Sequence, residues 1–486
     1  MRIDSPQPGD SAKLVRQLTL FDAVMVVVSG TIGASIFIVP ADVLRVVPNP
    51  VAALLLWVLA GGITLMAGLA CAELGGMFPE AGGQYIFIRE AYGRFAAFLY
   101  GWVLFTAGNS GGLAAMAISF ALFFGRAFPA LSADHLLFTH TVFGFKWELS
   151  QGSLIACAAV ALLTAVNLRS VKMAARLQNV TALAYLAAVV GIAAIGFLFG
   201  HGSFSHFAPA AGTSLSSISL KGAGIAMIAL LWSYDGWEFV SWVAGEIKNP
   251  RRNLPLALIL GILLIIVTYL LANALFLYAL PAAQLSRETA LTDAAMSALF
   301  SHDAGRLISL FIALICFGAA SVVVLGGARI YYSMACDGAF FQAMKRVHPR
   351  WKTPTTSLLA QCAWVIVLIL SGRYEQLYTC FVFMMTLTYV ATVGAVFVLR
   401  RTQPDRPRPY RCAGYPWLPI AYLIVASGFV LSTLLARPLE SLAGLCLALP
   451  GIPLYLYWRR AQIRREPGLG LTSSDAMTET IPSGRR

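Results

Sequence analysis

Charged residues are scarce in this 486-residue chain: Asp, Glu, Lys and Arg make up 12% of it, whereas 58% is hydrophobic. Soluble globular proteins carry about 25% charged residues. A soluble fold of this length would therefore lack the polar side chains needed to cover its surface. The high apolar content also excludes an intrinsically disordered chain. The composition predicts a membrane protein.

The chain contains long runs of apolar residues. A transmembrane helix needs about 20 apolar residues, and twelve runs qualify, at roughly 20–45, 51–77, 93–125, 152–168, 178–199, 222–245, 254–279, 306–334, 355–371, 375–399, 417–436 and 440–458. We predict an all-α polytopic membrane protein with twelve transmembrane helices, a polar tail over 1–18, one domain over 19–460, and a disordered tail over 461–486. No cleavable signal peptide is expected, because the first apolar run is too long for one.

Basic residues are rare on one side of the predicted spans. The formal net charge of +13 would suggest nucleic-acid binding in a soluble protein. With a cytoplasmic N-terminus, however, 27 of the 35 Lys and Arg residues fall in inner segments and only 7 in outer ones. This asymmetry follows the positive-inside rule. It predicts a multi-pass protein of the cytoplasmic (inner) membrane with both termini cytoplasmic, and no nucleic-acid partner.

Histidine is absent from the predicted spans, and cysteine from the predicted outer loops. The run Gly108-Asn109-Ser110-Gly111 matches the Gly-x-Ser-Gly of rhomboid-type proteases, but such a serine needs a histidine base inside the membrane. A zinc signature of the His-Glu-x-x-His type is also missing. A channel is a second rival, but no filter sequence repeats and no ring of charges appears. We therefore expect neither an enzyme nor a channel, and no metal or cofactor.

Two of the spans are interrupted by small and polar residues. In an inverted-repeat transporter, paired interruptions at matching positions indicate the substrate site. A half-helix that starts near Ser35 would direct free N–H groups at a carboxylate, and exposed carbonyls would suit an ammonium group. The predicted substrate-binding residues are Gly30, Thr31, Gly33, Ala34, Ser35, Ile36, Trp232, Ser233, Tyr234, Asp235 and Gly236. Small residues in membrane helices also serve packing, so each interruption alone has a purely structural interpretation.

The chain resembles the amino acid–polyamine–organocation superfamily over residues 18–460, and more closely bacterial permeases of the L-type amino acid transporter group. The resemblance rests on three stretches: Ala72-Glu73-Leu74-Gly75 with Pro79, Gly82-Gly83-Gln84-Tyr85, Glu90-Ala91-Tyr92-Gly93 and Phe98 to Trp102; Tyr234-Asp235-Gly236-Trp237 with Gly245 to Pro255; and Val171-Lys172 with Arg176 and Gln178.

This resemblance implies a transporter domain with a five-plus-five inverted repeat, two extra helices and discontinuous helices 1 and 6. It implies a carboxylate site at Gly33, Ala34 and Ser35, and a lid at Trp232. Many relatives carry a lysine in the fifth span, where this chain has Tyr185. Animal relatives join a glycoprotein through a cysteine between spans three and four. Residues 126–151 contain no cysteine, so we expect no disulfide-linked heavy-chain partner.

Acidic residues are almost missing from the predicted spans, which makes each of them a candidate for function. Glu73 could instead form a structural ion pair with an inner-loop arginine. Asp235 could receive a substrate ammonium group, accept a proton or cap the second half-helix. Glu238 resembles the glutamate at the same place in arginine and polyamine antiporters. The coupling candidates are thus Asp235, Glu238 and Tyr185.

The sequence predicts a secondary active transporter for L-amino acids, with neutral amino acids as the first choice of substrate. The alternative is a transporter or antiporter of cationic amino acids or polyamines, because Asp235 and Glu238 offer negative charge near the second interruption. An intramembrane enzyme or a channel is a distant alternative.

Overall fold

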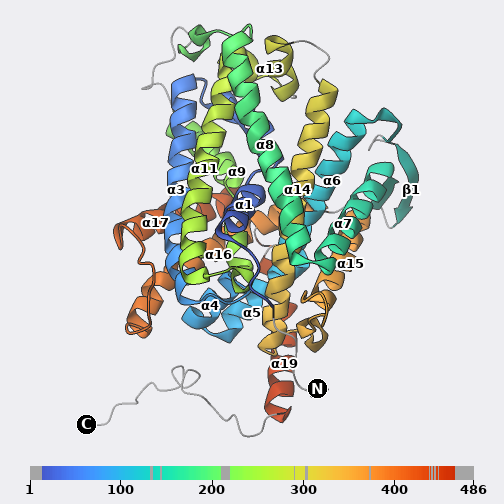
Figure 1. The fold of residues 1–486 in the computed structure, drawn as a ribbon, viewed down its shortest axis with the longest axis vertical. Helices are drawn as coiled ribbons and strands as arrows, with labels where there is room; N and C mark the ends of the chain where they lie inside the picture. Colours follow the sequence, from blue (N-terminus) through green and yellow to red (C-terminus); the bar gives the residue numbers. More distant parts are fainter. Residues whose placement is uncertain are drawn as a thin grey trace, which may run out of the picture.

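Apolar helices dominate the computed structural model of the chain (Figure 1). It describes residues 14–131, 135–142, 145–209, 219–288, 291–300, 305–371, 374–436, 438, 442, 445–446 and 448–465. Within these ranges eight helical segments are long and apolar enough to cross a membrane: Pro50–Met77, Arg94–Ala127, Gln151–Arg169, Val171–Phe199, Pro250–Ala279, Arg306–Cys336, Met384–Thr402 and Trp417–Leu435. Three shorter apolar helices accompany them, at Leu20–Thr31, Lys221–Ser233 and Thr355–Ser371. The chain is a polytopic membrane protein.

The long helices follow the second to fifth and the seventh to eleventh predicted spans, whereas part of the twelfth, 440–458, lies outside the described residues. They are α3 (Pro50–Met77), α5 (Arg94–Val103) continued by a π turn (Leu104–Gly108) and α6 (Asn109–Ala127), α7 (Gln151–Arg169), α8 (Val171–Phe199), α11 (Pro250–Ala279), α14 (Gly305–Cys336), α15 (Thr355–Ser371), α16 (Tyr374–Thr402) and α17 (Trp417–Ala436). The helix α3 packs along α11, and α6 packs along α14. Figure 1 shows α3, α11, α8 and α14 running roughly parallel to the long axis, with α1 between them.

The first and sixth predicted spans are each broken. In the first, α1 (Leu20–Thr31) is followed by a 3-10 turn (Ala34–Phe37) and α2 (Val39–Val46). In the sixth, α9 (Leu220–Ser233) is followed by a turn, α10 (Phe239–Trp242) and a 3-10 turn (Ala244–Glu246). A break exposes backbone polar groups, which a membrane protein tolerates only inside its own core or along a cavity. Both breaks lie where the sequence predicted them.

The fold is not purely helical, so the prediction of an all-α fold is wrong in one loop. Strands β1 (Leu136–Val142) and β2 (Phe145–Ser150) form an antiparallel hairpin between α6 and α7. In β2 the apolar residues Phe145, Trp147 and Leu149 alternate with Lys146 and Glu148. That period of two suits a strand, and the hairpin lies at one side of the bundle (Figure 1).

Short helices occupy loops in which the sequence predicted none: α4 (Gln84–Tyr92), α12 (Ala282–Leu285), α13 (Leu291–Leu299) and 3-10 turns at Pro129–Leu131, Phe204–Phe207 and Gln342–Lys345. The α4 and α19 helices lie toward one end of the molecule and α13 toward the other (Figure 1). The ends with α4 and α13 correspond to the predicted inner and outer sides.

Several helix boundaries differ from the prediction, and two of them have a similar cause. The fifth span was expected from 178, but α8 begins at Val171, where the Ser170 hydroxyl accepts a hydrogen bond from the Met173 amide and caps the helix. At the other end of the chain, α19 (Gly451–Arg465) continues past the boundary expected at 460. The first turns of α8 and the last turns of α19 contain basic residues such as Lys172 and Arg459, which suit a helix that projects from the membrane. Hydropathy alone misses these turns because they are not apolar.

Candidate functional site

The two helix breaks touch each other at Gly30 and Gly236. A Cβ atom added to Gly30 would lie 2.7 Å from the Gly236 carbonyl oxygen, and one added to Gly236 would lie 2.2 Å from the Gly30 carbonyl oxygen. Gly236 also has a φ of +103°, which other L-residues rarely adopt. Only glycine at both positions allows the two backbones to come so close. The contact brings the predicted binding residues of both spans to one place.

Tyr269 of α11 ties the ends of the two broken helices together. Its hydroxyl lies 3.1 Å from the carbonyl oxygen of Thr31 and 2.8 Å from that of Ser233, and its single proton is shared between these two acceptors. Thr31 is the last residue of α1 and Ser233 the last of α9. The carbonyls around Ser29 to Thr31 and Tyr234 to Gly236 were predicted to be exposed for an ammonium group, so the Thr31 carbonyl is one of them and the Ser233 carbonyl is not. Each has instead a partner from the protein, which leaves one of its two lone pairs for a ligand.

The first break presents open backbone at Gly33. No atom lies within 4 Å of the place where a Cβ atom would be, and the backbone there is extended. Ser35 and Ile36 are buried in the 3-10 turn that follows, which also contains Ala34. The second half-helix was expected to start near Ser35, but α2 begins at Val39, with a proline in its first turn. Proline is preferred at that place, and it moves the helix start four residues along the chain.

The second break carries Asp235, whose carboxylate accepts a hydrogen bond from a tyrosine. The Tyr389 hydroxyl of α16 donates a hydrogen bond to Asp235, and the Tyr389 ring stacks on Trp237 with ring centroids 5.7 Å apart. The residue before α10 is Glu238, whose side chain makes no capping hydrogen bond. The structure thus gives Asp235 a partner on α16, rather than the helix-capping role that was one of three alternatives.

Trp232 and Glu238 differ sharply in exposure. Trp232 is 37% exposed at the end of α9, a position from which a bulky ring can cover a ligand at the break. Glu238 is 0% exposed, and neither of its carboxylate oxygens has a hydrogen-bond partner in the part of the chain described. A buried carboxylate without a partner is costly in its charged form, which makes Glu238 a candidate to carry a proton.

Two further acidic residues, one in the second predicted span and one directly after the sixth, hold structural ion pairs. Glu73 accepts hydrogen bonds from Arg400, at 2.6 and 3.0 Å, and from the Cys412 amide at 2.7 Å. This pairing matches the structural alternative for Glu73. Glu246 pairs with Arg329 at 3.1 Å, and both side chains are fully buried. Arg329, which the topology count placed in an inner loop, lies within α14.

Tyr185 lines a small cavity between α1, α8 and α14. The cavity has a volume of about 10 Å³, and Ser29, Ile32 and Thr181 are among its other lining residues. That is enough for about one water molecule. The Tyr185 hydroxyl has no hydrogen-bond partner among the described residues, and its ring stacks on Phe311. The structure therefore places the hydroxyl of Tyr185, one of the coupling candidates, between the first broken helix and α14.

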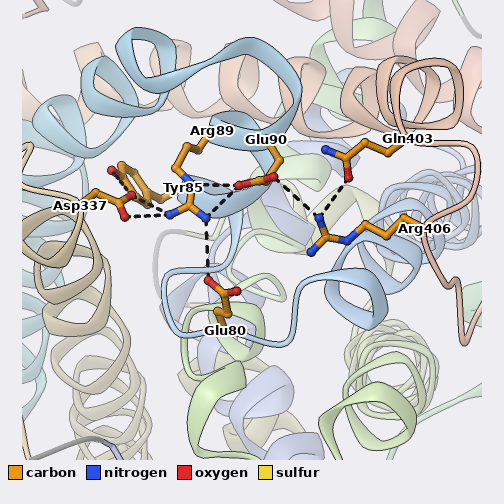
Figure 2. A network of polar contacts seen from close by, with 7 residues as sticks. All are labelled: Glu80, Tyr85, Arg89, Glu90, Asp337, Gln403 and Arg406. Atoms are coloured by element: carbon orange, nitrogen blue, oxygen red, sulfur yellow. Dashed lines mark hydrogen bonds and ion pairs between the residues drawn. The ribbon is translucent and has the colours of Figure 1, made fainter. Parts of the chain in front are cut away.

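A polar network ties α4 to two distant helix ends (Figure 2). Arg89 donates to Asp337, just beyond α14, at 2.7 and 2.9 Å, and to Glu90 at 2.9 and 3.1 Å. Glu90 lies 3.8 Å from Arg406, which follows α16. Burial opposes the positive charge of Arg89, but Asp337 and Glu90 outweigh it and raise the pKa of Arg89 above its ordinary value. The network holds three segments of the predicted inner face together.

Sequence reasoning did not identify Tyr269 or Tyr389. Each is an aromatic residue in the middle of a long apolar helix, where packing is the ordinary expectation. Both hydroxyls are buried and need a partner, which is a signal, but the sequence does not say which partner. Ser110, the candidate nucleophile of the rival protease hypothesis, donates to the Phe105 carbonyl at 2.7 Å. The π turn at Leu104–Gly108 accounts for that free carbonyl.

Known proteins are similar to this chain in sequence over nearly its whole length. The chain is 30% identical to the "Serine/threonine exchanger SteT" of Bacillus subtilis (strain 168) over 447 residues, which are 91% of this chain and 96% of that protein. It is 27% identical to the mouse "b(0,+)-type amino acid transporter 1" over 432 residues, 88% of this chain and 84% of the relative. It is also 27% identical to the human "Large neutral amino acids transporter small subunit 2" over 463 residues, 93% and 82% of the two chains.

The family described as "Amino acid permease" matches residues 18–443. That range covers both helix breaks, the Tyr269 bridge and the Asp235–Tyr389 pair. It agrees with the resemblance to the amino acid–polyamine–organocation superfamily and its L-type group. The chain belongs to the amino acid permease family.

Proposed function

We propose that this permease is a secondary active transporter that moves neutral L-amino acids across the cytoplasmic membrane by alternating access. The contact between Gly30 and Gly236 carries the proposal, since it joins two broken helices at one point in the core. The proposal includes twelve transmembrane helices, a five-plus-five inverted repeat and cytoplasmic termini. This arrangement is supported by the long helices that pack in pairs around the two broken helices.

The substrate is proposed to lie against the first break. The amides of Gly33, Ala34 and Ser35 would hold its carboxylate, because the backbone at Gly33 has open space beside it. The remaining lone pairs of the Thr31 and Ser233 carbonyls would accept from its ammonium group. Trp232, exposed at the end of α9, would close over it.

Neutral side chains fit this site better than charged ones. The names of the relatives include serine, threonine and large neutral amino acids among the transported compounds. In this chain the Asp235 carboxylate already accepts a hydrogen bond from Tyr389. A cationic amino acid or a polyamine is the second candidate, because Asp235 and Glu238 have no Lys or Arg partner among the described residues.

Counterflow in proteoliposomes tests the proposal. Vesicles loaded with unlabelled leucine, serine, arginine or putrescine are given the same compound in labelled form, with empty vesicles as the control. We expect transient accumulation with leucine or serine. Accumulation only with arginine or putrescine would establish the cationic alternative instead. A steady current with no counterflow would indicate a channel and refute the carrier mechanism.

Coupling is proposed to pass through Asp235, Glu238 or Tyr185. Glu238 is fully buried beside Asp235, and no Lys or Arg forms an ion pair with its carboxylate among the described residues. Loss or gain of one proton there would change the net charge at the second break. Tyr185 would act differently, as the uncharged replacement for a fixed cation between α1 and α8.

A further inference from the structure

Basic residues gather where α7, α8, α14 and α15 reach the predicted inner face. There α7 and α14 end, and α8 and α15 begin. The helix α7 packs along α15, and α8 packs along α14; Figure 1 shows α7 and α15 side by side at the edge of the bundle. We call these basic residues the basic patch, and they are Arg169, Lys172, Arg176, Arg346, Arg350 and Lys352. All are exposed except Lys352, which is half-buried.

A hydrogen bond joins the two loops that carry the basic patch. The hydroxyl of the buried residue Thr353 donates to the Leu168 carbonyl at 2.8 Å. Arg169 and Lys352 directly adjoin these two residues, so their backbones lie close together. The second loop is a closed turn, because the His348 amide donates to the Thr353 carbonyl and the Lys352 amide to the His348 carbonyl, both at 2.9 Å. The patch is therefore presented by one connected piece of backbone.

No carboxylate neutralises the basic patch. Residues 149–234, 305–336 and 338–374 contain no Asp or Glu, so α7, α8, α14 and α15 all lack acidic side chains. None of the basic residues of the patch forms an ion pair among the described residues. Acidic groups on neighbouring segments are already engaged: Asp22 accepts from Asn179 of α8 at 2.6 Å, and Asp337 accepts from Arg89.

The arginines that follow or end α16 differ from the basic patch, because carboxylates bind them. Arg400 and Arg408 share Glu73. Arg406 lies 3.8 Å from Glu90. The positive-inside rule accounts for the side of the membrane on which both groups are expected, but not for this difference in pairing. The basic patch thus has an excess of positive charge that the described protein does not balance.

Exposed apolar side chains adjoin the basic patch. On α8, Met173 is 39% and Val180 64% exposed, and Arg176 stands three residues after the first and four before the second. That spacing puts all three on one face of the helix. Leu162 of α7 and Leu359 of α15 are more than half exposed. An arginine within such a face suits the boundary of a bilayer, where its stem lies along apolar groups and its charge reaches the headgroups.

We propose that the basic patch binds the phosphate headgroup of an anionic phospholipid, whose acyl chains lie along the exposed apolar side chains of α7, α8 and α15. A soluble anionic partner would satisfy the charges but leave the apolar face uncovered. Clusters of Lys and Arg at the cytoplasmic ends of membrane helices are known headgroup sites. Trp351, which stacks on His348 with ring centroids 4.2 Å apart, adds an aromatic residue of the kind found at membrane interfaces.

Thermal unfolding of the full-length protein in detergent tests the proposal with three probes. They are dioleoyl phosphatidylglycerol, dioleoyl phosphatidylcholine, which has the same chains and a zwitterionic headgroup, and glycerol phosphate, which has the phosphate without the chains. We expect phosphatidylglycerol to raise the melting temperature at lower concentrations than phosphatidylcholine does, and glycerol phosphate to leave it unchanged. Equal action of the two lipids would overturn the proposal. Equal action of glycerol phosphate and phosphatidylglycerol would overturn it in favour of a small-anion site.

A triple variant removes charge from the basic patch: Arg169→Gln, Arg176→Gln and Lys352→Asn. Asparagine is chosen for the last position because Lys352 has a φ of +55°, a conformation in which asparagine is enriched. One basic residue near an anionic lipid surface changes binding about fivefold. We therefore expect the apparent affinity for phosphatidylglycerol to fall by about a hundredfold.

A control variant with the same loss of charge shows whether the position of the residues matters. It combines Arg401→Gln, Arg459→Gln and Arg460→Gln, which remove exposed residues of α16 and α19 outside the patch, and it should bind phosphatidylglycerol as the native protein does. An equal loss of affinity in both triple variants would overturn the proposal, because total charge would then attract the lipid. If the patch variant does not fold, Arg176→Gln and Arg176→Lys decide: the proposal holds if only the first weakens binding and fails if the two bind alike.

Discussion

The carbonyl oxygen of Gly30 lies 2.2 Å from the point that a Cβ atom on Gly236 would occupy. No side chain can be accommodated at that distance without movement of one backbone. The two glycines belong to helices that are separated by more than two hundred residues in the chain. Their contact fixes how the first and sixth spans cross.

Gly236→Ala should damage both folding and transport. The added methyl group meets the Gly30 backbone, and the φ of +103° is unfavourable for alanine. Overpacking of this kind costs about 1–3 kcal/mol, so we expect a lower melting temperature and little counterflow. Gly33→Ala is the matched control for stability, because nothing lies within 4 Å of its Cβ position. An equal loss of stability in both variants would show that the glycine contact is not tight.

Tyr269→Phe should weaken transport more than folding. It removes the hydroxyl that donates to Thr31 and Ser233, and one such hydrogen bond is worth about 1 kcal/mol. We expect initial uptake rates to fall by about fivefold, measured in proteoliposomes at a fixed protein content. Tyr278→Phe, further along the same helix, is the control. Unchanged uptake in Tyr269→Phe would mean that the bridge between the breaks has no part in the cycle.

Neutralising the acidic pair should remove the dependence of uptake on a proton gradient. Asp235→Asn and Glu238→Gln keep the size of the side chains but cannot exchange a proton. We expect uptake by the native protein to differ between external pH 5.5 and pH 8, and at least one of the two variants to give the same uptake at both. Vesicles with equal pH inside and outside are the control for effects on folding. If both variants keep the native pH profile, neither carboxylate is the coupling group, and Tyr185→Lys becomes the next variant to measure.

Glu73→Gln should lower the stability of the protein, because it removes an ion pair at the predicted inner face. The variant leaves Arg400 and Arg408 without the carboxylate that they share at 2.6 and 3.4 Å. Breaking a buried pair costs about 3 kcal/mol, less where the arginine is partly exposed to solvent. We expect a clear fall in melting temperature in detergent. Glu80→Gln is a suitable control, since Glu80 is mostly exposed and 3.8 Å from Arg89, and it should melt as the native protein does.

Cys412 should react slowly with alkylating reagents near neutral pH. Burial, with the negative charge of Glu73, raises the pKa of this thiol to about 11. Only the thiolate reacts, and a raised pKa means that the thiolate forms only as the pH approaches 11. Labelling by iodoacetamide, followed by peptide mass spectrometry, should increase about tenfold per pH unit between pH 7 and 10. Glutathione in the same tube should level off near pH 9, and Glu73→Gln should label faster. Labelling of Cys412 as fast as glutathione at pH 7.5 would contradict the burial.

Hydropathy and glycine placement predicted much of the helical fold. The interruptions at Gly33 and Asp235 were visible because polar and small residues stand inside apolar runs. The hairpin at Leu136–Ser150 was missed because a two-strand ribbon is too short to give a strong signal among twelve apolar runs. The early start of α8 was missed because its first turns are basic and project from the apolar region.

The candidate site was predicted only in part, because long-range contacts do not follow from local patterns. The break residues themselves came from the sequence. Their partners lie far away in the chain: Tyr269 is 36 residues from Ser233, and Tyr389 is 154 residues from Asp235. Only the packing of α11 and α16 against the breaks brings those hydroxyls into reach.

The start of the first span is joined to the inner end of the sixth by backbone hydrogen bonds. Gln17 and Leu18 donate to the Glu246 carbonyl at 2.7 and 2.9 Å, and the Lys248 amide donates to the Leu18 carbonyl at 2.8 Å. Such bonds break only at a cost, so the inner ends of both broken spans should travel as one piece during the transport cycle. A spin label on each of them would then keep one constant separation, whereas labels on α4 and α1 would report the opening.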